Sequence, residues 1–244
     1  MNVMTAWPAR SLLGAVGLTA LLFLPGGGST PLLGTATAAA APTCPGHPQP
    51  VEVRFHARFD AARLDHTRGR HTINQMFLKS HGTATPPHGG LGTAVGLTAT
   101  RSEFRFNTRT QMYRHANGGY CVYLRSVEAH LNQIDTVVYV AREFPKNSCA
   151  YDVTYAHEKK HVGIYYFTHK EFAARIETAL RRLVLDVNPR LASSREAART
   201  VHATMIEQGL ADLLADLDRE RTERNAMLDS DESYAREQAK CPSW

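Results

Sequence analysis

One decapeptide lies within the longest helical pattern of the chain and has a spacing of residues typical of metal binding: Val153-Thr154-Tyr155-Ala156-His157-Glu158-Lys159-Lys160-His161-Val162. It contains the pattern His-Glu-x-x-His. Helix positions i and i+4 lie one turn apart on the same face, so the imidazoles of His157 and His161 can reach one ion. The spacing therefore predicts a zinc site formed by these two histidines.

The carboxylate between the two histidines has a separate predicted function. Glu158 points around the helix toward the position of the water that completes an open zinc site. Zinc lowers the pKa of such a water to about 7, so a nucleophile is present at neutral pH. We therefore predict that Glu158 is the catalytic general base.

The surrounding sequence predicts two long helices. Asn147 or Ser148 can cap a helix over 150–187, and the dipeptide Asn188-Pro189 ends it. A second helix over 193–228 has apolar residues at helical spacing, and its charged run 218–224 is expected to be exposed. Two long helices joined by a short break are expected to pack antiparallel.

Strand signals precede the helices. Alternating or β-branched patterns predict strands at 51–57, 104–107, 120–124 and 136–140, and 72–80 fits a short helix. The expected fold is therefore α+β: a small antiparallel sheet followed by a long antiparallel helical hairpin that carries the HExxH motif.

The N-terminus is typical of export. Arg10 precedes an apolar run over 12–24, and small residues follow at 36–41, so residues 1–38 are predicted to be a signal peptide. An uncleaved membrane anchor is the alternative. Residues 39–50 are expected to form a loose segment, and 51–244 a single zincin-like metallopeptidase domain. After cleavage we expect no stable membrane insertion and a secreted or periplasmic location.

Charge and cysteine content narrow the class of protein. The net charge of +5 is spread along the chain and forms no basic stripe, so a nucleic-acid partner is not expected. The four cysteines of an exported chain indicate two disulfides. Of three possible pairings, we favour Cys121–Cys149, which closes a loop before the motif, with Cys44–Cys241, which joins the ends of the domain.

The motif and its surroundings resemble the zincin metalloproteases, which share an H-E-x-x-H helix behind an edge strand. More narrowly, segments 138–149 and 228–234 resemble a group of uncharacterised bacterial proteins predicted to be secreted zinc-dependent proteases. The resemblance covers about half the chain, and only the H-E-x-x-H motif is sharply specific. It implies zinc at the two histidines, Glu158 as base, and pairing of an extended substrate with the strand at 136–141.

The third zinc ligand is not given by the known zincin extensions. The pattern H-E-x-x-H-x-x-G-x-x-H fails, because position 167 is Phe, and His169 is expected on the surface. The resemblance implies a ligand in the C-terminal region, where Glu232 is our first choice. Glu220, a carboxylate on the apolar stripe of the second helix, is the second choice, and Asp229 the third.

These observations predict an exported zinc-dependent hydrolase, a peptidase that acts on a peptide or protein substrate. Zn²⁺ is the expected cofactor, held by His157, His161 and Glu232. Tyr234 or Tyr155 is a candidate hydrogen-bond donor to a developing oxyanion. A non-catalytic zinc-binding envelope or interaction protein is the alternative. The sequence leaves the substrate and the oligomeric state open.

Overall fold

The structure is a computed structural model that describes residues 43–46, 50–81, 93–116 and 118–244. The predicted signal peptide, residues 1–38, lies outside the described residues, as does part of the expected loose segment 39–50. The domain from residue 51 onward contains five strands and four helices among the described residues. In chain order these are β1 (Glu52–Phe59), β2 (Arg63–Asp65), α1 (Arg70–His81), β3 (Gly96–Arg114), β4 (Tyr120–Val140), α2 (Cys149–Asp186), β5 (Arg190–Ala192), α3 (Arg195–Leu228) and α4 (Asp231–Gln238).

Strand β4 is the centre of the sheet. The two strands predicted at 120–124 and 136–140 are one continuous strand of 21 residues. Its middle is also a strand because Val127, Ala129 and Leu131 alternate with more polar residues and are almost fully buried. Every other strand pairs with β4: β3 lies along one edge, and β5, β1 and β2 follow one another along the other.

The prediction of a small antiparallel sheet is wrong. Strands β1 and β2 pair with β4 in parallel, while β3 and β5 pair with it antiparallel, so the sheet is mixed. A period of two shows which face of a strand is buried but gives no information on the direction of its neighbour. Here β2, α1 and β3 separate β1 from β4 in sequence, which gives the chain room for a parallel return.

The strand at 136–141 is also not the edge strand that the resemblance implied. Residues 137–139 pair with β2 on one side and with β3 on the other. Within the described part of the chain, β3 pairs only with β4, so its second edge is the one without a strand partner.

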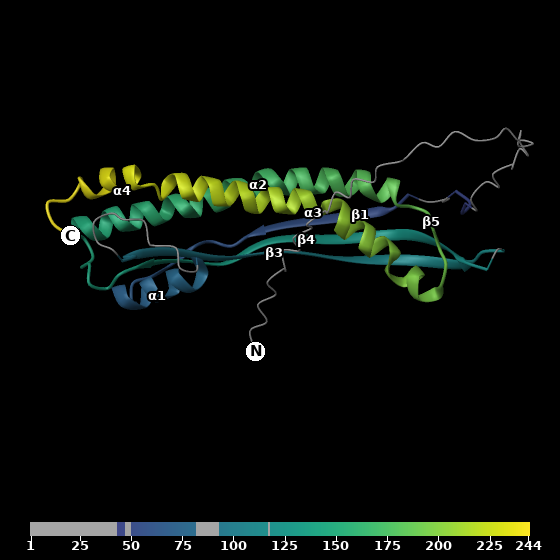
Figure 1. Ribbon diagram of the computed structural model, residues 1–244, viewed down its shortest axis with the longest axis horizontal. Coiled ribbons are helices and arrows are strands. Elements are labelled where there is room, and N and C mark those ends of the chain that lie inside the picture. Colours follow the sequence, from purple (N-terminus) through teal and green to yellow (C-terminus); the bar gives the residue numbers. More distant parts are fainter. Residues whose placement is uncertain (1–42, 47–49, 82–92, 117) are drawn as a thin grey trace, which may run out of the picture. The chain divides into compact units, whose positions relative to one another are not determined.

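Helices α2 and α3 lie side by side along one face of the sheet (Figure 1). Ser148 caps α2 by accepting a hydrogen bond from the backbone N–H of Tyr151, and Ser194 caps α3 in the same way. Between the helices, the Asn188 side chain accepts from the backbone N–H of Leu124 at 2.8 Å, which fixes the connection to β4. The main core lies between this face and the helices, and includes Leu124, Val127, Leu131, Phe172, Ile176, Leu180, Ile206 and Leu210.

Two disulfides are present, Cys44–Cys121 and Cys149–Cys241, so the predicted pairing is wrong. Cys121 lies at the start of β4, whose far end is about 60 Å away at roughly 3.3 Å per residue. The nine residues from the end of β4 to Cys149 span at most about 30 Å, too few to return to Cys121. Among the described residues, no helix is long and apolar enough to cross a membrane.

The core makes a stability prediction. Ile176 is fully buried between α2 and the sheet, so Ile176→Ala is expected to lower the free energy of unfolding by about 2–5 kcal/mol. Denaturant unfolding of the oxidised protein measures this. Leu185→Ala on the same helix is the control, because Leu185 is 69% exposed and its loss is expected to cost less than about 0.5 kcal/mol. Equal effects of the two changes would contradict the assignment of the buried face.

The core also makes a pH prediction. Burial lowers the pKa of His202 from 6.5 to about 4. As the pH falls from about 6.5 toward 4, the unfolded chain takes up this proton before the folded chain does. His202 therefore costs up to about 1.4 kcal/mol of stability per pH unit in that window. His202→Leu is expected to lessen the acid dependence of the unfolding free energy, and an unchanged dependence would contradict this.

Candidate metal centre

The two motif histidines face each other on α2. His157 and His161 are 4% and 8% exposed, and their Nε2 atoms lie 3.2 Å apart. This approach follows from the helix, because residues four apart lie one turn above each other. The sequence prediction that the two imidazoles can reach one ion therefore agrees with their placement.

A third donor atom meets them from α3. Asp229 is the C-cap of that helix, and its Oδ1 lies 3.1 Å from the Nε2 of His157 and 3.1 Å from the Nε2 of His161. Ligands about 2.0–2.1 Å from a tetrahedral zinc ion lie roughly 3.3 Å from one another. The three observed separations are close to this value, so the cluster of His157, His161 and Asp229 fits a zinc ion in both geometry and donor chemistry.

The other residues considered as third ligand lie elsewhere. Glu232, the first choice, is in the first turn of α4 with its side chain 83% exposed, and it pairs with Arg236 at 2.6 Å. Glu220, the second choice, pairs with Arg224 at 2.7 Å. The structure therefore brings Asp229, and neither glutamate, to the two histidines.

The register of the helices places Asp229 opposite the motif. The Nδ1 of His161 lies 2.7 Å from the side-chain oxygen of Asn225, and His157 lies opposite Asp229. Both pairs place the centre of the hairpin at Ser193. A turn at Asn188-Pro189 would instead have placed residue 221 opposite His157. The difference arises because β5 lies in the connection and α3 begins only at residue 195.

Asn225 also orients His161 as a ligand. Because an amide oxygen only accepts hydrogen bonds, the Nδ1 of His161 donates the 2.7 Å bond. In this structure Nε2 of His161 carries a proton and donates it to Asp229; loss of that proton would leave the tautomer that binds a metal through Nε2. Sequence analysis did not identify Asn225, although it lies four residues before Asp229 on the same helix face.

Glu158 is buried beside the cluster. Its Oε2 accepts a hydrogen bond of 2.8 Å from the hydroxyl of Thr98 on β3. The strand can approach this closely because residue 96 is glycine: a Cβ there would lie 2.5 Å from the Oε1 of Glu158. Burial raises the pKa of Glu158 above its usual value, although the neighbouring histidines act in the opposite direction.

The charges of the cluster are strongly coupled. Burial alone would lower the pKa of His161, but its hydrogen bond to Asp229 and the charge of Glu158 raise it to about 9. Burial likewise opposes ionisation of Asp229, yet hydrogen bonds from His157 and His161 hold the pKa of that carboxyl well below its usual range. The proton on His161 therefore balances the charge of the buried Asp229 carboxylate.

Tyr234, one of the two tyrosines considered as an oxyanion donor, lies at the cluster. Its hydroxyl is 3.0 Å from the Oδ1 of Asp229 and 3.3 Å from the Nε2 of His157. Burial and the charge of Asp229 raise its pKa, so the hydroxyl keeps its proton. Tyr155 instead stacks on Tyr151 in a second core cluster.

A cavity of about 540 Å³ connects the cluster with the interior of the helix–sheet layer. His157, Glu158, His161, Asp229 and Tyr234 line one part of it. Its other lining residues come from α1, the segment before β3, β3, β4, α2, α3 and the C-terminal segment, and include Thr98, Thr100, Ser102, Gln133, Arg221 and Trp244. The cluster of His157, His161 and Asp229 therefore lines a cavity large enough for a small molecule.

Two expectations about polar residues near this cavity are wrong. His169 was expected on the surface but is 4% exposed, and burial lowers its pKa to about 4. Arg221 belongs to the charged run expected to be exposed, yet it is 5% exposed. A sequence signal existed for Arg221, because it continues the four-residue spacing of Leu217 and precedes Asn225 by four.

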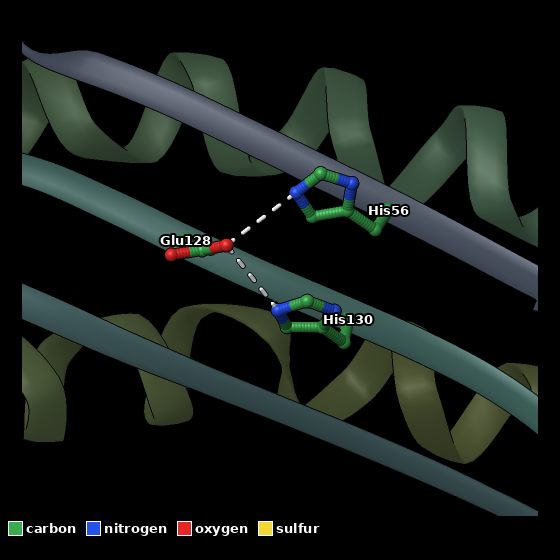
Figure 2. Close-up of side chains that lie close together, drawn as sticks. All are labelled: His56, Glu128 and His130. Carbon is green, nitrogen blue, oxygen red and sulfur yellow. Dashed lines mark ion pairs between the residues drawn. The ribbon is translucent and has the colours of Figure 1, made fainter.

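A second group of potential metal ligands lies on the opposite face of the sheet from α2 and α3 (Figure 2). His56 belongs to β1, while Glu128 and His130 belong to β4. Their donor atoms lie within 4.8 Å of one another, but the three side chains are partly exposed. The cluster of His157, His161 and Asp229 differs in being buried and in lining the cavity.

Comparisons of this chain with protein-family models, with curated proteins and with solved structures find no match.

Proposed function

We propose that this chain is an exported zinc-dependent hydrolase that acts on peptides or proteins, with zinc held by His157, His161 and Asp229. The observation that carries the proposal is the meeting of three donor atoms within 3.2 Å of one another. They lie beside a buried carboxylate and at a cavity of about 540 Å³. The resemblance to zincins and to predicted secreted zinc-dependent proteases belongs to this proposal, with Asp229 in place of Glu232.

Export is supported by the cysteines as well as by the N-terminal sequence. Both disulfides lie in the part of the chain after the predicted signal peptide. Disulfides persist in oxidising compartments such as the periplasm and the extracellular medium.

Glu158 fits the function of general base. A bound zinc ion supplies Lewis acidity and lowers the pKa of water near it. Glu158 would then accept a proton, and its raised pKa suits the transfer of that proton to a leaving amine near neutral pH. The hydroxyl of Thr98 fixes the carboxylate, and Tyr234 can donate a hydrogen bond to charge that develops on the scissile carbonyl oxygen.

Strand β3 supports a peptide as substrate. Residues 95–98 line the cavity, and the edge of β3 that faces away from β4 has no strand partner among the described residues. An extended peptide could pair with this edge through its backbone. The cavity and the buried Glu158 favour a hydrolase over the alternative of a non-catalytic zinc-binding protein, which needs neither.

Zinc content tests the ligands. The purified protein is expected to hold one zinc ion per chain at this centre, and Asp229→Ala is expected to lose it, as is the double change His157→Ala/His161→Ala. Elemental analysis after dialysis measures the loss relative to the unchanged protein. Glu232→Ala is the matched control, because its exposed side chain pairs with Arg236 and its loss is expected to leave zinc content unchanged. Loss of zinc in Glu232→Ala but not in Asp229→Ala would refute the assigned third ligand.

Hydrolysis tests Glu158. In a library of quenched fluorescent peptides, Glu158→Gln is expected to lower kcat/KM by about 10²–10⁴-fold, because the amide cannot accept the proton. Zinc content is expected to stay the same. Glu223→Gln on the exposed surface of α3 serves as the control and is expected to keep full activity. A zinc-loaded Glu158→Gln variant with unchanged hydrolysis would exclude the proposed mechanism.

A further inference from the structure

Arg221 is a buried cation without a buried anion. It is 5% exposed, and its guanidinium donates to the hydroxyls of Thr168 at 3.1 Å and Ser102 at 2.8 Å. Within the described ranges, no carboxylate oxygen lies within 4 Å of it, and its Nη2 has no hydrogen-bond partner. Burial lowers the pKa of Arg221, the charge of Asp218, three residues earlier on α3, acts in the opposite direction, and the ring of Tyr165 lies 5.8 Å from the guanidinium. Neither Asp218 nor Tyr165 forms a hydrogen bond with Nη2, so this donor of a permanently charged group stays unpaired.

Arg221 lines the same cavity as the metal cluster. The surroundings of its guanidinium are polar, with Thr100, Ser102 and Gln133 also in the lining. The amide oxygen of Gln133, which is 0% exposed, likewise lacks a hydrogen-bond partner among the described residues. The Nη2 of Arg221 needs an acceptor such as a carboxylate, and the Oε1 of Gln133 needs a donor such as a peptide N–H, so a peptide that carries a carboxylate can satisfy both.

Two independent spacings give the separation between Arg221 and the metal cluster. Eight residues of α3 separate Arg221 from Asp229, which is about 12 Å of helix rise. On β3, four residues separate Ser102, which binds Arg221, from Thr98, which binds Glu158; that is about 13 Å of strand. A peptide of three to four residues in extended form covers this length.

We infer that Arg221 forms an anion subsite that recognises a carboxylate of the substrate about three residues from the scissile bond. This inference rests on the proposed function and specifies its substrate class: acidic peptides. An acidic side chain or a free C-terminal carboxylate has the required chemistry, because guanidinium binds carboxylates with charge-assisted hydrogen bonds. Substrate binding would also supply a hydrogen-bonded anion to the Nη2 of Arg221, which has no partner among the described residues.

Binding without turnover tests the subsite. The zinc-loaded Glu158→Gln protein is titrated with an N-acetylated, C-amidated hexapeptide containing one Glu, and with the same peptide containing Gln. Tighter binding of the Glu peptide by about 10- to 100-fold is expected, and Arg221→Met is expected to remove this difference. Arg221→Lys keeps the charge and is expected to keep part of it. A second pair of peptides, one amidated and one with a free C-terminal carboxylate, distinguishes the two sources of the carboxylate.

The outcomes separate the two proposals. If the Glu158→Gln protein prefers the acidic peptides and Arg221→Met abolishes the preference, the subsite is established whether or not a hydrolysed substrate has been found. If wild-type protein cleaves peptides but neither acidic peptide is preferred, or if folded Arg221→Met keeps the preference, the subsite is refuted and the hydrolase proposal stands. Circular dichroism and zinc content establish that the variants are folded.

A second inference comes from the other face of the sheet and does not depend on the function. The Nε2 atoms of His56 and His130 each lie 3.6 Å from the same Oε1 of Glu128, and their rings stack at 4.8 Å (Figure 2). His56 and His130 are directly opposite each other in the parallel pairing of β1 with β4, so the backbone holds the rings side by side. We propose that these three side chains bind a divalent transition metal with open positions toward solvent.

Copper(II) is the probe for this site, because imidazole sites bind it most tightly and its electron paramagnetic resonance spectrum reports nitrogen ligands. In the His157→Ala/His161→Ala protein, one copper ion with two nitrogen ligands is expected, and the further change His56→Ala/His130→Ala is expected to remove it. In otherwise unchanged protein, His56→Ala/His130→Ala is expected to lower copper stoichiometry by one. The exposed His71→Ala is the control. Unchanged stoichiometry after loss of His56 and His130 would refute the site.

Discussion

The register between α2 and α3 is the constraint on which the candidate metal centre depends. The motif on α2 offers two potential ligand atoms from one helix face. Zinc sites in proteins have three or four protein ligands, so at least one more must come from elsewhere. Packing against the sheet sets which residues of α3 face the motif. With the core of Ile176, Leu180, Ile206 and Leu210 in place, Asn225 falls opposite His161 and Asp229 opposite His157. A shift of α3 by one residue would rotate Asp229 by about 100° away from the histidines.

Burial of this centre shifts the pKa values of its side chains and also carries a free-energy penalty. Transfer of a carboxylate and two imidazoles from water to the interior is unfavourable unless they are paired, and here each pairs with the others at 3.1–3.2 Å. The same burial raises the pKa of Glu158, which lies beside the cluster and hydrogen-bonds to Thr98. The pKa values of Asp229 and Glu158 are thus shifted in opposite directions in one cavity: despite burial, the pKa of Asp229 is lowered by its hydrogen bonds, and that of Glu158 is raised by burial.

What sequence could predict here was local. The spacing of His157 and His161, the capping of α2 by Ser148 and the bounds of the long helices follow from patterns within a few residues. The direction of β1, the continuity of β4 and the disulfide pairing depend on contacts between distant segments, and these predictions were wrong or incomplete. Asp229 was in the predicted set but ranked last, because the resemblance implied a ligand in the C-terminal region without fixing the residue, and the register that selects Asp229 depends on the length of the connection between the helices. Arg221 looked like part of a solvated charged run, although its spacing from Leu217 marked it as facing inward.

The C-terminal segment completes the site because it is attached to the motif helix. The disulfide Cys149–Cys241 ties the segment after α4 to the first turn of α2, and Glu237 pairs with Lys160 between the two histidines. Tyr234 lies within this attached segment, five residues after Asp229. Its hydroxyl turns back toward the cluster and lies 3.0 Å from the Oδ1 of Asp229. A covalent link to α2 on one side and the end of α3 on the other leave α4 little freedom to move. Tyr234 is therefore held at the cluster by the same two helices that carry His157, His161 and Asp229, so its hydroxyl keeps a fixed position relative to these three side chains.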